Sequence, residues 1–164
     1  MRGTPSSSSG APAENSPGNS RRNASLSPQG SVRFRIMVVD DDWVIADSLT
    51  EILRRSGYTT ETAYDGTGAL QMALLSPPEL VITDVVLPGM NGVELATILK
   101  SVYPDCKILL CSGHGSTPEL LSSPHCAPYD FTLLSKPVRP ADLLAWVEYR
   151  LGTGGPVLVP IAAA

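Results

Sequence analysis

The chain has 164 residues and a formal net charge of −4, and 43% of its residues are hydrophobic. This length suggests one domain of ordinary size plus terminal segments, and the apolar content is too high for a wholly disordered protein. The apolar runs are far shorter than the roughly 20 residues that span a bilayer, and the first residues lack the apolar core of a secretion signal. The sequence therefore predicts a cytoplasmic protein that does not enter the membrane.

Composition and charge divide the chain into three stretches. Residues 1–32 are rich in Ser, Gly and Pro and carry three arginines against one glutamate. Such a segment buries too little apolar surface to offset its ordering entropy, so we expect a disordered tail. Residues 33–151 hold 9 basic and 15 acidic side chains, and this acidic balance argues against nucleic-acid binding. Residues 152–164 are expected to form a short C-terminal tail.

Strand-like and helix-like patterns alternate between the two tails. Short apolar or β-branched runs predict strands, and apolar residues spaced three and four apart predict amphipathic helices. The predicted strands are residues 32–39, 58–64, 80–83, 106–111 and 131–134, and the predicted helices are 43–56, 66–75, 92–102, 117–122 and 140–151. Five strand–helix units in succession predict a doubly wound α/β domain, with a five-stranded parallel sheet covered by helices on both faces.

Polar side chains stand at the carboxyl ends of four of these predicted strands. In a doubly wound sheet these ends meet at one rim, where ligands bind. The residues are Asp40, Asp41 and Asp42 after the first strand, Asp84 after the third, Ser112 after the fourth and Lys136 after the fifth. We therefore expect the chemistry of the protein to lie at this rim.

The residue types at the rim point to phosphoryl chemistry. Several carboxylates repel one another, and a divalent cation relieves this repulsion. Oxygen ligands suit Mg²⁺ or Mn²⁺, and Mg²⁺ keeps some water ligands and binds phosphate oxygens. A carboxylate can also attack phosphorus and form an acyl phosphate. The oxygens of the transferred group would then face the cation, Lys136 and Ser112.

The chain resembles the receiver domain of bacterial two-component response regulators over about residues 33–151. Four blocks carry this resemblance, in order and at the predicted strand ends. They are residues 36–42 (Ile-Met-Val-Val-Asp-Asp-Asp), 80–92 (Leu-Val-Ile-Thr-Asp-Val-Val-Leu-Pro-Gly-Met-Asn-Gly), 108–113 (Ile-Leu-Leu-Cys-Ser-Gly) and 133–137 (Leu-Leu-Ser-Lys-Pro). The resemblance implies a flavodoxin-like (βα)5 fold with the strand order 2-1-3-4-5.

The resemblance also implies a role for the acidic residues. Asp84 would accept the phosphoryl group from a histidine kinase or a histidine phosphotransfer protein. Asp41 and Asp84 would bind Mg²⁺ directly, Asp40 would assist through water, and Val86 would supply its backbone carbonyl. Chemistry at Asp84 is self-catalysed in the family, and the acyl phosphate hydrolyses slowly, so the protein would be a signalling switch rather than an enzyme.

The remaining family positions include one departure. Ser112 would grip the phosphoryl group and Lys136 would pair with its oxygens, and the Lys136–Pro137 peptide is often cis in the family. Three residues before the lysine, receivers often carry an aromatic residue that reports phosphorylation, but Leu133 stands here. Phe131 lies two residues earlier and would face the same side of the strand. The resemblance therefore leaves the aromatic switch in doubt, but not phosphorylation.

Too few residues follow position 151 for an output domain, so we expect a stand-alone receiver that is read by a separate downstream protein. Two alternatives stay open. Residues 40–44 fit the opening motif of haloacid-dehalogenase-type phosphatases, with Asp40 as nucleophile and Asp42 as acid, although Asp84 would then have no role. A pseudo-receiver would bind proteins without phosphorylation. A structural alternative for Asp41 or Asp42 is to cap the first helix.

Three cysteines, Cys106, Cys111 and Cys126, show no metal-ligand spacing. Two of them lie in or beside an apolar strand. We therefore expect reduced and mostly packed thiols.

Overall fold

The computed structural model describes residues 25–26, 32–113, 129 and 131–153. The predicted helix at 117–122 and most of the two predicted tails lie outside these residues, and so does Cys126. Among the described residues, every helix is too short or too polar to cross a membrane.

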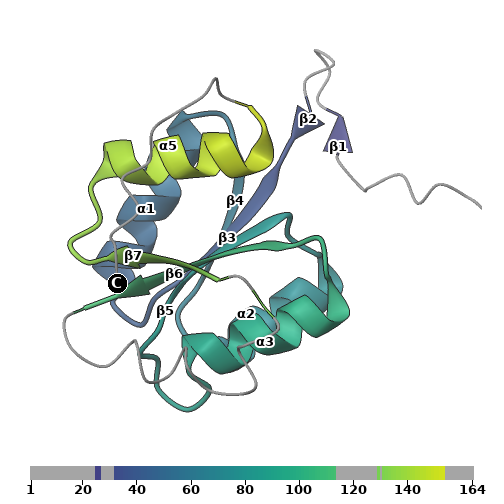
Figure 1. Cartoon of the computed structure of the whole chain (residues 1–164), viewed down its shortest axis with the longest axis vertical. Helices are drawn as coiled ribbons and strands as arrows, with labels where there is room; N and C mark the ends of the chain where they lie inside the picture. Colours follow the sequence, from purple (N-terminus) through teal and green to yellow (C-terminus); the bar gives the residue numbers. More distant parts are fainter. Residues whose placement is uncertain (1–24, 27–31, 114–128, 130, 154–164) are drawn as a thin grey trace, which may run out of the picture.

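A five-stranded parallel sheet forms the centre of the described domain (Figure 1). Its strands are β3 (Arg35–Val39), β4 (Thr59–Ala63), β5 (Leu80–Asp84), β6 (Lys107–Ser112) and β7 (Thr132–Ser135). They lie in the spatial order β4-β3-β5-β6-β7, which confirms the predicted order 2-1-3-4-5. The order reverses between β3 and β5, so the rim beside these two strands is the topological switch point of the sheet.

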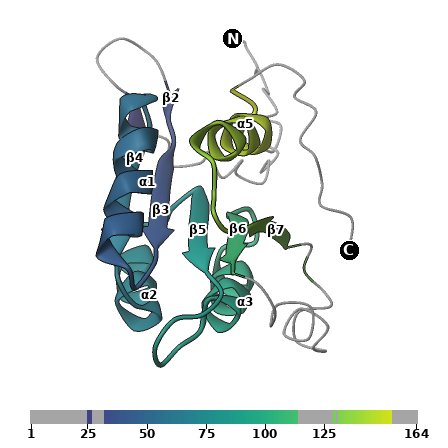
Figure 2. The ribbon, with the colours of Figure 1, turned by 90° about the vertical axis from the view of Figure 1, so that its left-hand side faces the viewer.

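Helices cover both faces of the sheet, which confirms the doubly wound architecture (Figures 1 and 2). The helices are α1 (Trp43–Arg55), α2 (Gly66–Leu75), α3 (Gly92–Val102) and α5 (Pro140–Leu151). Apolar side chains of α1 and α5 pack on one face, and those of α2 and α3 pack on the other.

Strand β5 shows why the central strands are apolar throughout. Leu80 and Ile82 belong to the core under α1 and α5, whereas Val81 belongs to the core under α2 and α3. Successive side chains of a strand point to opposite faces, so a strand that is covered on both sides needs apolar residues at consecutive positions. Each buried Leu, Ile or Val contributes about 1.5–3 kcal/mol relative to an exposed one.

Three helices start with a side-chain cap on the residue that directly precedes the helix. Asp42 accepts hydrogen bonds from the first backbone N–H groups of α1, and Asp65 does the same for α2. Asn91 caps α3, and Glu94 completes a reciprocal capping box. These caps satisfy N–H groups that lack a partner within the helix, so they fix where each chain segment leaves the rim.

The first predicted strand, 32–39, is divided in the structure. β2 (Val32–Arg33) pairs antiparallel with β1 (Ser25–Leu26), whereas β3 belongs to the main sheet. Phe34 lies between β2 and β3 and packs against the core under α1 and α5. The other predicted boundaries of the described elements either match the observed ones or differ from them by one residue, a difference that carries no structural meaning.

Candidate functional site

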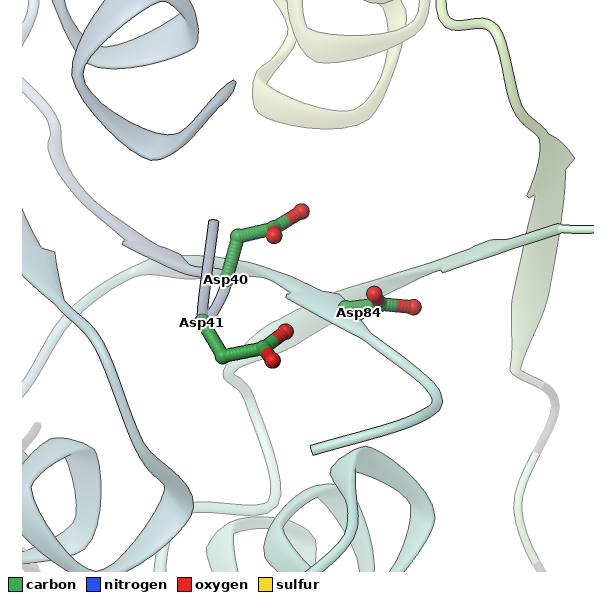
Figure 3. Close-up of side chains that lie close together, drawn as sticks. All are labelled: Asp40, Asp41 and Asp84. Carbon is green, nitrogen blue, oxygen red and sulfur yellow. The ribbon is translucent and has the colours of Figure 1, made fainter. Parts of the chain in front are cut away.

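Three carboxylates meet at the carboxyl rim of the sheet (Figure 3). Asp40 and Asp41 follow β3, Asp84 ends β5, and these two strands are neighbours in the sheet. One carboxylate oxygen from each residue lies within 4.8 Å of the others. Asp40 is buried, Asp84 is partly buried and Asp41 is exposed. The cluster therefore runs from the interior of the domain to its surface.

The three consecutive aspartates have different surroundings. Asp40 Oδ1 accepts a hydrogen bond from the backbone N–H of Asp42 at 3.0 Å, and its Oδ2 accepts one from Lys136 Nζ at 2.7 Å. Asp42 turns away from the cluster and caps α1, with Oδ1 2.9 Å from the backbone nitrogen of Val44. The capping alternative therefore applies to Asp42. Of the three consecutive aspartates, only Asp40 and Asp41 belong to the carboxylate cluster.

Asp84 is held by two donors from different parts of the chain. Its Oδ1 accepts a hydrogen bond from the backbone N–H of Val86 at 3.2 Å, and its Oδ2 accepts one from Lys136 Nζ at 2.7 Å. Lys136 follows β7, and its own backbone N–H donates to the Ser112 carbonyl at 2.7 Å. The lysine thus bridges two acids that lie 96 and 52 positions away in the sequence.

Two opposing effects act on the pKa of Lys136. Partial burial of the ammonium works to lower this pKa, while the hydrogen bonds to Asp40 and Asp84 work to raise it. The two carboxylates together outweigh burial, and the pKa of Lys136 rises above its usual value of 10.5. The lysine therefore stays cationic throughout the physiological range.

Ser112 ends β6 on the same rim and is buried. Its hydroxyl donates to the carbonyl of Gly113 at 2.8 Å, and β6 lies between β5 and β7. The structure therefore brings the predicted serine onto the rim between the strands that carry Asp84 and Lys136. Residues 114–128, which follow this strand, lie outside the described part of the chain.

The remaining residues of the predicted site are also placed. The Lys136–Pro137 peptide is cis, as the resemblance implied. Phe131 and Leu133 both pack against the core under α2 and α3, which confirms that they share one side of the strand. Val86 is 61% exposed beside Asp84, and its hydrocarbon side chain has no ligand atom, so only its backbone carbonyl could bind a cation.

Two features near the rim were missed by sequence reasoning. Thr83 is fully buried, and its hydroxyl donates to the backbone carbonyl of Asp84 at 3.0 Å. The available signal was a hydroxyl residue at the end of an otherwise apolar strand. The second feature is an apolar groove of about 540 Å³ between α1 and the segment that joins β7 to α5. Its lining residues are Val44, Ile45, Ser48, Leu49, Ile52, Lys136, Pro137, Val138 and Pro140.

The rim has the charge and the ligand atoms for a hard divalent cation. Three carboxylates against one ammonium give these four groups a formal charge of −2, and every available ligand atom is oxygen. Oxygen ligands and incomplete protein coordination are what Mg²⁺ prefers. The residues present therefore fit a Mg²⁺ ion, and the carboxylate of Asp84 is partly exposed at the same rim.

Sequence comparisons identify the same stretch of chain. The family described as "Response regulator receiver domain" matches residues 36–148. The DNA-binding response regulator MtrA of Mycobacterium tuberculosis is 35% identical over 121 residues, which are 74% of this chain and 52% of MtrA. Response regulator MprA of Mycobacterium ulcerans is 36% identical over 111 residues, which are 68% of this chain and 47% of MprA. The chain thus spans about half the length of these relatives.

Solved structures agree with the topology. A CheY-like response regulator receiver domain protein from Methanospirillum hungatei superposes with a TM-score of 0.67 at 31% identity. The match covers 74% of this chain and 95% of that protein. Chemotaxis protein CheY4 of Vibrio cholerae gives a TM-score of 0.63 at 28% identity, covering 71% of this chain and 98% of CheY4.

Proposed function

The chain belongs to the receiver-domain family of response regulators, and we propose that its rim is a phosphorylation switch in which Asp84 accepts the phosphoryl group. One observation carries this proposal. Lys136 Nζ lies 2.7 Å from both Asp40 and Asp84, beside a cluster of three carboxylates. This arrangement supplies a nucleophile, a fixed positive charge and oxygen ligands for Mg²⁺ within one small volume.

The acids divide the remaining work. Asp41, Asp84 and the backbone carbonyl of Val86 would hold Mg²⁺, and Asp40, which is buried beneath these two more exposed acids, would contribute through water. When bound, Mg²⁺ supplies positive charge to the phosphoryl oxygens. Asp40 also stays paired with Lys136 when the second contact of the lysine passes from the Asp84 carboxylate to the incoming phosphoryl group.

The transfer step is a displacement at phosphorus. A carboxylate oxygen of Asp84 forms the new P–O bond as the P–N bond of a donor phosphohistidine breaks, and the donor nitrogen keeps the electron pair. Lys136 then pairs with a phosphoryl oxygen instead of the free carboxylate, and the Ser112 hydroxyl donates to another. Water later attacks the phosphorus, the bond from phosphorus to the Asp84 oxygen breaks, and inorganic phosphate leaves while the free carboxylate returns. Acceptance and slow hydrolysis thus use the same residues.

The donor is a histidine kinase or a histidine phosphotransfer protein, since receiver domains of response regulators generally interact with these proteins. The apolar groove beside Lys136 offers such a donor a docking surface next to the acceptor. Ile45→Asp should therefore slow transfer from a protein donor but not from the small donor acetyl phosphate. Leu75→Asp, on the exposed end of α2, is the matched control and should change neither rate.

Phosphorylation adds up to about two negative charges at the rim. We propose that the resulting shift of Ser112 and Lys136 changes the surface that a downstream protein reads. The DNA-binding property in the name of MtrA belongs to that protein, and we propose no nucleic-acid contact for the acidic residues 33–151 of this chain. The stand-alone character of the receiver and its tails at 1–32 and 152–164 remain predictions.

The deciding experiment is a beryllofluoride titration with Mg²⁺, followed by the fluorescence of Trp43, which starts α1 beside the rim. Wild type should saturate only when Mg²⁺ is present, and Asp84→Asn should lose the response while keeping its fold. A response that survives in Asp84→Asn but disappears in Asp40→Asn would contradict the proposal and favour the phosphatase alternative. A folded wild type that gives no response at all would favour the pseudo-receiver alternative.

A further inference from the structure

The backbone of Asp84 packs against a glycine that starts the next helix. Gly92 is buried as the first residue of α3. A Cβ atom at this position would overlap the carbonyl oxygen of Asp84 and lie 2.8 Å from its carbonyl carbon. It would also lie 3.0 Å from the Thr83 hydroxyl oxygen. Any side chain at position 92 must therefore displace the backbone of the residue that carries the acceptor carboxylate.

Hydrogen bonds close the β5–α3 connection around this contact. The backbone N–H of Gly92 donates to the carbonyl of Val85 at 3.0 Å, and the hydroxyl of Thr83 donates to the carbonyl of Asp84 at 3.0 Å. The capping box of Asn91 and Glu94 fixes the first turn of α3, and Leu95 anchors that turn in the core. The strand end and the helix start therefore cannot separate without breaking several buried contacts.

We infer that Gly92 is a positioning residue for Asp84, and that Thr83 assists it from within β5. This inference rests on the proposed role of Asp84. The carbonyl and the carboxylate of Asp84 share one Cα, so a displaced carbonyl moves the carboxylate as well. The carboxylate makes contacts of 2.7 Å with Lys136 and 3.2 Å with the Val86 N–H, and these contacts tolerate little displacement.

Gly66 provides the comparison with a glycine that serves packing alone. It is buried as the first residue of α2, and a Cβ there would lie 2.5 Å from the carbonyl oxygen of Met90. Both glycines thus start a helix against a backbone carbonyl of the same β5–α3 segment, Gly92 at the strand end and Gly66 in the loop. Only Gly92 touches the residue that carries the acceptor carboxylate. Loss of stability is expected in both alanine variants, but loss of the metal site only in Gly92→Ala.

The test measures Mg²⁺ affinity by Trp43 fluorescence and the free energy of unfolding by urea, in wild type, Gly92→Ala, Gly66→Ala and Thr83→Val. Gly92→Ala should weaken Mg²⁺ binding about tenfold or more, since a displacement on the order of 1 Å is enough to disrupt such a site. Gly66→Ala should stay within about twofold of wild type in the same measurement. Thr83→Val keeps the side-chain volume and should weaken binding by a smaller factor.

Wild-type Mg²⁺ affinity in a folded Gly92→Ala would overturn the inference, as would an equal loss of affinity in Gly66→Ala. If Gly92→Ala does not fold, Thr83→Val decides, and unchanged affinity in that variant overturns the inference. A wild-type domain that binds no Mg²⁺ would contradict the proposed function itself, so the two failures are distinguishable.

Discussion

In two clusters of this domain, one charged side chain lies between two side chains of the opposite charge. At the rim, Lys136 Nζ lies 2.7 Å from Asp40 and from Asp84. On the outer surface of α1, Glu51 lies 2.9 and 2.8 Å from two arginines of the last turn. The distances are similar, but the rim partners are 96 and 52 positions apart, whereas the helix partners are three and four apart.

Burial separates the two clusters. The side chains at the rim are 3–21% exposed, and those on α1 are 44–79% exposed. Water and salt screen an exposed pair, which typically contributes about 0–1 kcal/mol. A partly buried charge is costly to leave without its partner. Short distance alone therefore does not mark a functional site, whereas convergence of distant acids and a base in a partly buried place does.

Among the substitutions proposed here, removal of Lys136 from the rim cluster should have the largest effect. Lys136→Ala leaves Asp40 and Asp84 without their shared cation, and the free energy of unfolding should fall by about 1–3 kcal/mol. Mg²⁺ should still bind and should recover part of this loss, but the fluorescence response to beryllofluoride should be much smaller. Lys107→Ala removes a lysine at the opposite end of β6 and should leave the response intact. An unchanged response in Lys136→Ala would refute the role of this lysine.

The two buried thiols, on which burial outweighs the nearby lysines, should respond to pH in another way. Burial raises the pKa of Cys106 and of Cys111 to about 12, against 9.0 for an ordinary thiol. Unfolded thiols ionise above pH 9 and folded ones do not, so this stability is complete below pH 9 and is lost toward pH 12. Each thiol should lower the free energy of unfolding by about 1.4 kcal/mol per pH unit in that window. Urea unfolding of wild type and of the double alanine variant measures the difference, and equal slopes would contradict the expectation.

Asp42, the third consecutive aspartate, tests whether an acid takes part in the rim site because of its place in the sequence or because of the direction of its side chain. Asp42→Ala removes the cap of α1 and should cost about 1 kcal/mol of stability. The backbone N–H that Asp42 donates to Asp40 remains in this variant. Acceptance of phosphate from acetyl phosphate should therefore be close to wild type. A variant that folds but accepts no phosphate would restore the phosphatase alternative, in which Asp42 is the acid.

The exposed cluster should give the smallest effect. Glu51→Gln removes the charge between the two arginines and should change the free energy of unfolding less than any of the preceding variants. The change should shrink further at high salt, because the pair is exposed. Urea unfolding at two salt concentrations measures this. A salt-independent loss as large as that of Lys136→Ala would show that exposure does not separate the two clusters.

The sequence predicted the rim because topology alone brings strand ends together. Asp84 and Lys136 each follow an apolar run, and a doubly wound sheet places the carboxyl ends of such runs on one edge. The contact between Lys136 and Asp40 could not be predicted, because it depends on the direction of each side chain, and residue spacing does not determine that direction. The contact of Gly92 with Asp84 could not be predicted either, because a glycine at the start of a helix is equally consistent with an ordinary turn. The break at Phe34 depends on β1, which lies in a stretch predicted to be disordered.

The most direct test of the central claim is to identify the residue that carries the phosphoryl group. The domain is incubated with acetyl phosphate and Mg²⁺, the acyl phosphate is reduced with borohydride, and peptide mass spectrometry locates the resulting homoserine. The account predicts homoserine at position 84 alone, and none when Mg²⁺ is removed. Homoserine at position 40 or 41, or its absence from a folded domain that binds Mg²⁺, would contradict the account.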